Sequence, residues 1–206
     1  MSKLLTAGAV VLSLIVGPAL AQERFPPVPP DKYDDAQKKA AEEFLAARKR
    51  PVYGPFARLM HSPEVMTVAR QMGDHLRFKS GVGTTLSELV ILVTAREWSQ
   101  DYEWDVHAPI ALKEGIKAEI VEAIRDGRRP AGMSDDEEIC YDFSIELHRN
   151  KRVSDATYAR AEKRFGKKGV VDLIGINGYY SLLAMAMNTD RMPISPEGKK
   201  LPRFPE

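Results

Sequence analysis

Between residues 31 and 187, apolar side chains recur every three or four positions, the spacing that places them on one face of an α-helix. No convincing strand alternation and no Asn-Gly hairpin interrupts this pattern. The helices that it predicts span residues 31–50, 62–79, 85–98, 102–114, 117–125, 134–150, 154–165 and 170–187. We therefore predict an all-α fold.

Two of these helices begin with the sequence of a capping box. Thr85 and Glu88, like Ser134 and Glu137, are three residues apart, so that each side chain can bond the backbone amide of the other residue. The five residues after Glu88 are all apolar and cover every side of their helix. This indicates that helix 85–98 lies at the centre of the fold.

The first 22 residues differ from the rest of the chain, because Lys3 is their only charged residue. An apolar run follows Lys3, and Ala19-Leu20-Ala21 has the small-x-small form of a signal-peptidase site. We expect cleavage after Ala21 and a secreted or periplasmic mature protein; an uncleaved anchor is the alternative. The predicted organisation is a signal peptide at 1–21, a proline-rich tether at 22–34, a helical domain at 35–190 and an extended, proline-containing tail at 191–206.

Residues 173–189 contain no charged side chain, so a membrane-spanning helix is an alternative for the last predicted helix. Their number is at the lower limit for spanning, and they include Asn177 and two glycines. We expect instead a helix that is buried on most sides, with a partner subunit covering part of it. We expect no stable membrane insertion once the signal peptide is removed.

The overall composition excludes several classes of function. With 30 Lys and Arg against 29 Asp and Glu, the 206 residues carry no basic footprint for nucleic acid. Cys140 is the only cysteine, so a disulfide framework within the chain is impossible. The sequence lacks HExxH, CxxC, a glycine-rich phosphate loop and GxSxG. We expect neither a metal ion nor a cofactor.

Reactive side chains concentrate between Glu88 and His107. Glu103 and His107 are four residues apart and share one helix face, and Glu88 begins the neighbouring apolar helix. In an apolar cleft, two carboxyl groups and an imidazole can hold a proton donor beside a proton acceptor. Three alternatives stay open: a surface ion pair, a purely structural role for Glu88 as capping partner of Thr85, and a divalent metal site, which the lack of a second histidine disfavours.

The same region resembles a known family. Glu88-Leu-Val-Ile-Leu, followed by Tyr102-Glu-Trp-Asp-Val-His107-Ala-Pro-Ile-Ala-Leu-Lys-Glu-Gly115, is similar to the carboxymuconolactone decarboxylase family, which includes the AhpD-like alkylhydroperoxidases. The resemblance covers about residues 35–190 and extends to the segments Arg152-Val-Ser-Asp-Ala-Thr-Tyr158, Arg164-Phe-Gly166 and Asn177-Gly-Tyr-Tyr180. It implies an AhpD-like, all-helical fold that assembles as homo-trimers or hexamers.

The chain departs from this family at two positions. The AhpD-like peroxidases resemble it in having a glutamate and a histidine where Glu88 and His107 stand, but they carry a CxxC pair where this chain has Gln100 and Glu103. Disulfide exchange needs a thiolate, and Cys140 has no partner within the chain. The resemblance therefore disfavours thiol peroxidase activity and favours the decarboxylase-like side of the family.

We accordingly predict a decarboxylase-like lyase that uses metal-free acid–base chemistry to convert a small, anionic lactone or keto acid. The expected catalytic residues are His107 as general base or acid, Glu103 as the group that orients it, and Glu88 as the second proton-transfer group. The alternative is a non-catalytic, oligomeric binding module with the same fold.

Three further residues are expected to bind the substrate. Tyr102 can donate a hydrogen bond, Trp104 can form a wall of the pocket, and Arg96 can bind a carboxylate bidentately. For the two aromatic side chains, packing in the core is an equal alternative. Tyr179 and Tyr180 either reach the cleft from the last helix or form an oligomer contact.

Overall fold

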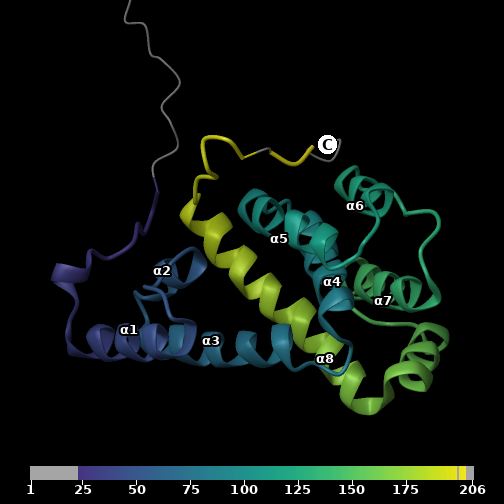
Figure 1. The fold of residues 1–206 in the computed structure, drawn as a ribbon, viewed down its shortest axis with the longest axis horizontal. Coiled ribbons are helices and arrows are strands. Elements are labelled where there is room, and N and C mark those ends of the chain that lie inside the picture. Colours follow the sequence, from purple (N-terminus) through teal and green to yellow (C-terminus); the bar gives the residue numbers. More distant parts are fainter. Residues whose placement is uncertain (1–22, 199, 203–206) are drawn as a thin grey trace, which may run out of the picture.

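The computed structural model describes residues 23–198 and 200–202, and the predicted signal peptide with its cleavage site after Ala21 lies outside them. All regular elements of these residues are helical, which confirms the predicted fold class (Figure 1). A short 3₁₀ turn, η1 (Pro30–Lys32), precedes the helices α1 (Asp35–Arg48), α2 (Pro55–Leu59), α3 (Pro63–Phe78), α4 (Thr84–Glu97), α5 (Asp101–Lys113), α6 (Ala118–Arg125), α7 (Asp135–Asn150) and α8 (Asp155–Asp190).

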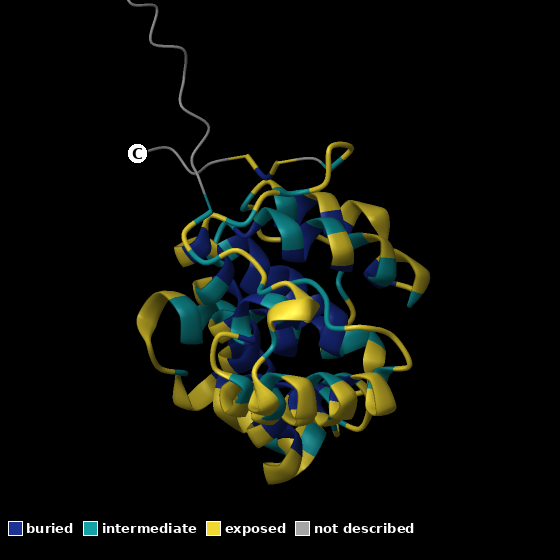
Figure 2. Cartoon of the chain, turned by 90° about the vertical axis from the view of Figure 1, so that its left-hand side faces the viewer, coloured by how far each residue is buried: buried dark blue, intermediate teal, exposed yellow. Residues whose placement is uncertain are grey.

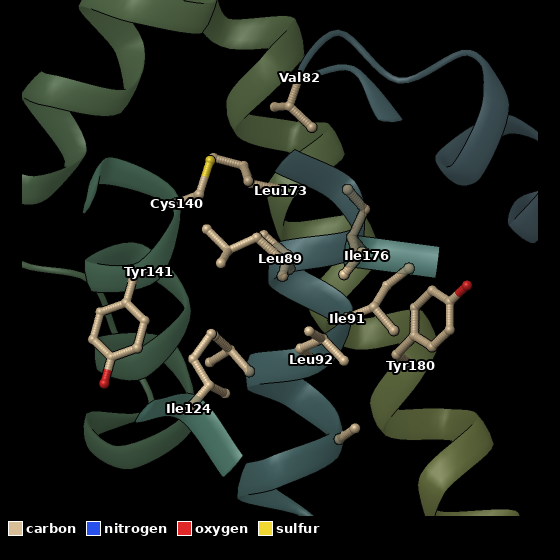
Figure 3. Packing of buried hydrophobic residues seen from close by; sticks show 14 of the residues in the cluster. Val82, Leu89, Ile91, Leu92, Ile124, Cys140, Tyr141, Leu173, Ile176 and Tyr180 are labelled. Atoms are coloured by element: carbon tan, nitrogen blue, oxygen red, sulfur yellow. The ribbon is translucent and has the colours of Figure 1, made fainter. Parts of the chain in front are cut away.

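Helix α4 is the centre of the molecule, as its all-round apolar sequence predicts. Every residue from Ser87 to Arg96 is buried, and α4 packs against α5, α6, α7 and α8. Figure 3 shows Leu89, Ile91 and Leu92 of α4 among the side chains of the main core. Buried residues fill the interior, and exposed residues cover the outer helix faces (Figure 2).

The structure confirms one predicted capping box and contradicts the other. At the start of α7, the backbone amide of Ser134 donates to Glu137 at 2.7 Å, and the box is complete. Helix α4 instead begins at Thr84, and its N-cap residue is Gly83, which has no side chain to form a cap. The hydroxyl of Thr85 lies inside the helix and donates to the carbonyl of Glu114 at 3.0 Å. The prediction of a capping role for Glu88 was therefore wrong, and its carboxyl group is engaged elsewhere.

The two helices predicted at the end of the chain are joined in α8. Gly166 has a φ of 67° and separates its two parts, where the pattern places the end of the first. By length and composition, α8 could cross a membrane, a test that the core helix of a soluble protein also passes. More than half of its most apolar stretch is buried within the protein, against α3, α4 and α7 among others.

Helices α1, α2 and α3 form a unit with a small core of its own, which contains Phe44, Phe56 and Met60. Helix α2 was not predicted, because its five residues are too few to show a helical period. In Figure 1, α8 passes between this unit and the helices α4 to α7. Contacts of α2 and α3 with α8 join the two parts.

Candidate functional site

Helix α5 positions two of the three predicted catalytic residues. The side-chain oxygen of Gln100 caps the helix by accepting from the backbone amide of Tyr102 at 2.7 Å, so that α5 begins at Asp101. Glu103 and His107 then lie one turn apart and are both buried. Because α5 packs against α4, this face meets the central helix.

The structure brings Glu88, Glu103 and His107 together in the interior. The three residues are 1%, 3% and 4% exposed, respectively. Oε2 of Glu88 lies 2.6 Å from Nδ1 of His107, which is a strong hydrogen-bond distance. Oε2 of Glu103 lies 3.4 Å from Nε2 on the other side of the ring. The imidazole is therefore flanked by two carboxyl groups, one held closely and one more loosely.

The two carboxyl groups have different surroundings. Burial raises the pKa of Glu103, and the nearby charge of Glu88 adds to this effect, while His107 and Arg77 oppose it. Glu88 instead receives a hydrogen bond from the guanidinium of Arg77, at 3.3 Å from its Oε1. Burial thus favours the neutral form of Glu103, whereas Glu88, on the opposite side of the imidazole, is paired with a guanidinium.

A cavity of about 50 Å³ opens beside this group. Glu103 and His107 line it, whereas Glu88 is not among its lining residues. Its other polar lining residues are Arg48, Tyr53, Arg77, Tyr102, Tyr179 and Tyr180. Burial raises the pKa of Tyr102 and of Tyr180, so both hydroxyl groups stay protonated and are able to donate hydrogen bonds.

The three expected substrate-binding residues have different positions. Tyr102 lines the cavity. Trp104 is a buried member of the main core, which agrees with the packing alternative. Arg96 is buried on α4 but lines a separate small cavity, together with Tyr141 and other residues of α4, α6 and α7. The structure therefore does not bring Arg96 to the site.

Sequence reasoning missed Arg48 and Arg77, which supply the guanidinium groups of this cavity. Arg77 lies four residues after the buried Gly73 on α3, so that a charged residue falls on a buried stripe of that helix. Such a position is a usable signal for a functional arginine. Tyr180 reaches the site, as one alternative predicted, and its ring makes an edge contact with His107 at 5.2 Å between centroids.

The arrangement does not favour the alternative of a metal site. The two carboxyl groups approach different nitrogens of His107, and therefore do not converge on one point with it. Within residues 23–198 and 200–202, no group of three or more His, Cys, Asp and Glu side chains has the geometry to hold a metal ion.

No family model and no curated protein matches the chain. Among solved structures, it is similar to the AhpD core of an uncharacterised peroxidase-related protein from Ralstonia eutropha JMP134, with a TM-score of 0.68 and 16% identity over 87% of this chain and 95% of that one. A peroxidase-related protein from Silicibacter sp. TM1040 gives a TM-score of 0.67 and 13% identity over 88% and 96%. The chain has the AhpD-like fold.

Within this AhpD-like fold, the surroundings of Cys140 do not favour thiol chemistry. It is buried on α7, and burial raises the pKa of its thiol well above the ordinary value. A thiolate is the reactive form of cysteine, so burial disfavours reaction at Cys140. The polar groups around His107 are therefore the ones available for chemistry at this site.

Proposed function

We propose that this protein is an enzyme that performs acid–base catalysis on a small molecule bound beside His107. The observation that supports the proposal is the imidazole buried between two carboxyl groups of different character at the wall of a cavity. Burying three ionisable groups costs several kcal/mol unless they are paired, and perturbed groups of this kind cluster at functional sites.

The geometry favours an exchange of the roles predicted for the two glutamates. Glu88 holds Nδ1 of His107 at 2.6 Å and does not line the cavity, so it is the group that orients the ring. Glu103 lines the cavity and has a raised pKa, so it is the proton donor. His107 then presents Nε2 as the general base.

These roles describe a balanced reaction on a carbonyl compound. Nε2 of His107 accepts a proton from the carbon next to the carbonyl, while Glu103 gives its proton to the carbonyl oxygen, which yields an enol. In a decarboxylation, the carbon–carbon bond to the carboxylate breaks instead, carbon dioxide leaves, and Glu103 protonates the enolate oxygen that receives the electron pair. Hydrogen bonds from Tyr102 or Tyr180 can stabilise the same developing oxyanion.

The cavity supports a small, anionic substrate such as a lactone acid or a keto acid. Its volume of about 50 Å³ accommodates only a few non-hydrogen atoms. Arg48 and Arg77 line it. Nε of Arg77 is buried without a hydrogen-bond partner among the described residues, whereas Nε of Arg48 lies 2.7 Å from a carboxylate oxygen of Asp74. A carboxylate oxygen would satisfy such a donor.

The test is turnover of a panel of small lactones and keto acids by the wild-type protein and by His107→Gln. We expect the variant to lose about 10²- to 10⁴-fold in kcat, the usual contribution of general acid–base catalysis, with an unchanged circular dichroism spectrum. His61→Gln is the matched control, because His61 is exposed and bonds only the carbonyl of Pro26 in the described part of the chain. Equal turnover by folded His107→Gln would contradict the proposal. Ligand-induced thermal stabilisation without any product would instead favour the binding module.

A further inference from the structure

Arg77 belongs to a different helix than Glu88 and His107, which lie on α4 and α5. It lies on α3, and its Nη2 donates to Oε1 of Glu88 at 3.3 Å across the interface with α4. The other oxygen of the same carboxylate lies 2.6 Å from Nδ1 of His107. The side chain of Glu88 is only 2% exposed and that of Arg77 is 19% exposed, so water screens this contact weakly.

This chain of contacts restricts the carboxylate of Glu88 in two ways. Because each oxygen has its own partner, rotation about the terminal bond of the side chain would break both contacts. Because a guanidinium stays protonated in proteins, Arg77 is a permanent positive charge, and it stabilises the ionised form of its partner. An ionised carboxylate has no hydrogen to donate, so it can only accept.

The contacts of Glu88 determine which ring nitrogen of His107 carries a hydrogen. If the carboxylate of Glu88 can only accept, then Nδ1 of His107 must carry the hydrogen of this bond. In a neutral ring, the lone pair is then on Nε2, which is the nitrogen that approaches Glu103. The choice of tautomer thus depends on Arg77 through its contact with Glu88.

We propose that Arg77 is a positioning residue that orients the carboxylate of Glu88 as the hydrogen-bond acceptor of Nδ1, and thereby fixes the tautomer of His107 with Nε2 as the base. Its effect on turnover depends on the proposed function, whereas its effect on the tautomer does not. The two can therefore fail separately.

The experiment measures the ¹⁵N chemical shifts of the His107 ring near neutral pH, together with kcat and KM. In the wild type, we expect the Nδ1–H tautomer. In Arg77→Gln, we expect a mixture of tautomers and a fall in kcat of at least about tenfold, because a histidine in the wrong tautomer is a poor base. Arg77→Lys keeps the positive charge, and we expect it to restore the wild-type tautomer and most of kcat.

Arg149→Gln is the matched control. Arg149 forms an arginine–glutamate pair with Glu97, at 2.7 Å, and does not line the cavity beside His107. We expect it to change neither the tautomer nor kcat. Should Arg77→Gln be unfolded, Arg77→Met carries the same test, because it keeps most of the side-chain volume.

The outcomes separate the two proposals. An unchanged tautomer in a folded Arg77→Gln or Arg77→Met protein would overturn the role of Arg77, whatever its turnover. The tautomer could instead change in Arg77→Gln and return in Arg77→Lys although the protein turns over no lactone or keto acid. This result would support the positioning role of Arg77 and reject the enzymatic function.

Discussion

Burial gives Glu103 a thermodynamic signature that needs no knowledge of the substrate. Its pKa in the folded protein is raised from 4.5, chiefly by desolvation, so the folded protein keeps a proton that the unfolded chain has released. The free energy of unfolding contains a contribution from Glu103 that is fully present below pH 4.5 and is lost as the pH rises through the raised pKa.

Glu103→Gln removes this titration. We therefore expect the free energy of unfolding of the variant, relative to the wild type, to increase as the pH rises from about 4 to 8. Urea unfolding at several pH values measures the difference. Glu122→Gln, at an exposed position of α6, is the control and should give a constant difference. A constant difference for Glu103→Gln as well would show that its pKa is not raised.

At the scale of single residues, part of the site could be predicted from local sequence and part could not. Glu103 and His107 are one helical turn apart, so their spacing alone places them together. Arg96 belongs to a helix that is buried on all sides. The apolar pattern of such a helix does not indicate which of its faces lines the cavity. Arg77 contributes from another helix, and its contact with Glu88 exists only once α3 and α4 have packed.

At the scale of elements, the N-terminal segment and α2 are tied to the end of α8 by a buried carboxylate. Asp190 is wholly buried, and it accepts from Nε of Arg58 at 2.9 Å and from the backbone amide of Phe25 at 2.7 Å. Arg58 also pairs with Glu23. This contact joins helices whose residues, including Phe56 of α2, line the cavity.

We expect Asp190→Asn to lower the free energy of unfolding by about 2–4 kcal/mol, because the buried guanidinium of Arg58 loses the more deeply buried of its two carboxylate partners. Urea denaturation at pH 7 measures the loss. Asp126→Asn is the matched control: its pair with Arg128 is largely exposed, and exposed pairs contribute little. A loss for Asp190→Asn no larger than that of the control would contradict a stabilising role for this contact.

The helices themselves were more predictable than their ends. Long amphipathic segments such as α3 and α7 show several periods of the pattern, whereas α2 is shorter than two turns and shows none. The start of α4 was misplaced because Thr85 has two ways to satisfy its hydroxyl group. A contact with Glu114, far along the chain, prevailed over the local cap, and sequence spacing does not contain that information.

At the scale of the whole molecule, α8 presents an apolar face that the described residues leave exposed. Val171, Ile174, Leu182 and Met185 are 64%, 49%, 38% and 44% exposed. Their spacing places them on one side of the helix, and Gly178 lies among them with open space around it. Several exposed apolar side chains along one helix face are typical of interfaces, which agrees with the oligomer that the family resemblance implies.

We therefore expect the protein to form a homo-oligomer through this face of α8, and Ile174→Glu to dissociate it, because a charge cannot be buried in an apolar interface without a partner. Light scattering after size-exclusion chromatography measures the mass of each form. Leu45→Glu is the matched control, since Leu45 is equally exposed, at 50%, but lies on α1. A wild-type monomer at micromolar concentration would contradict the predicted oligomer. An oligomer that Ile174→Glu leaves intact would place the interface on another face. Because Tyr179 and Tyr180 lie on α8 beside this face, loss of the oligomer should also weaken turnover if the assembly holds the cavity wall in place.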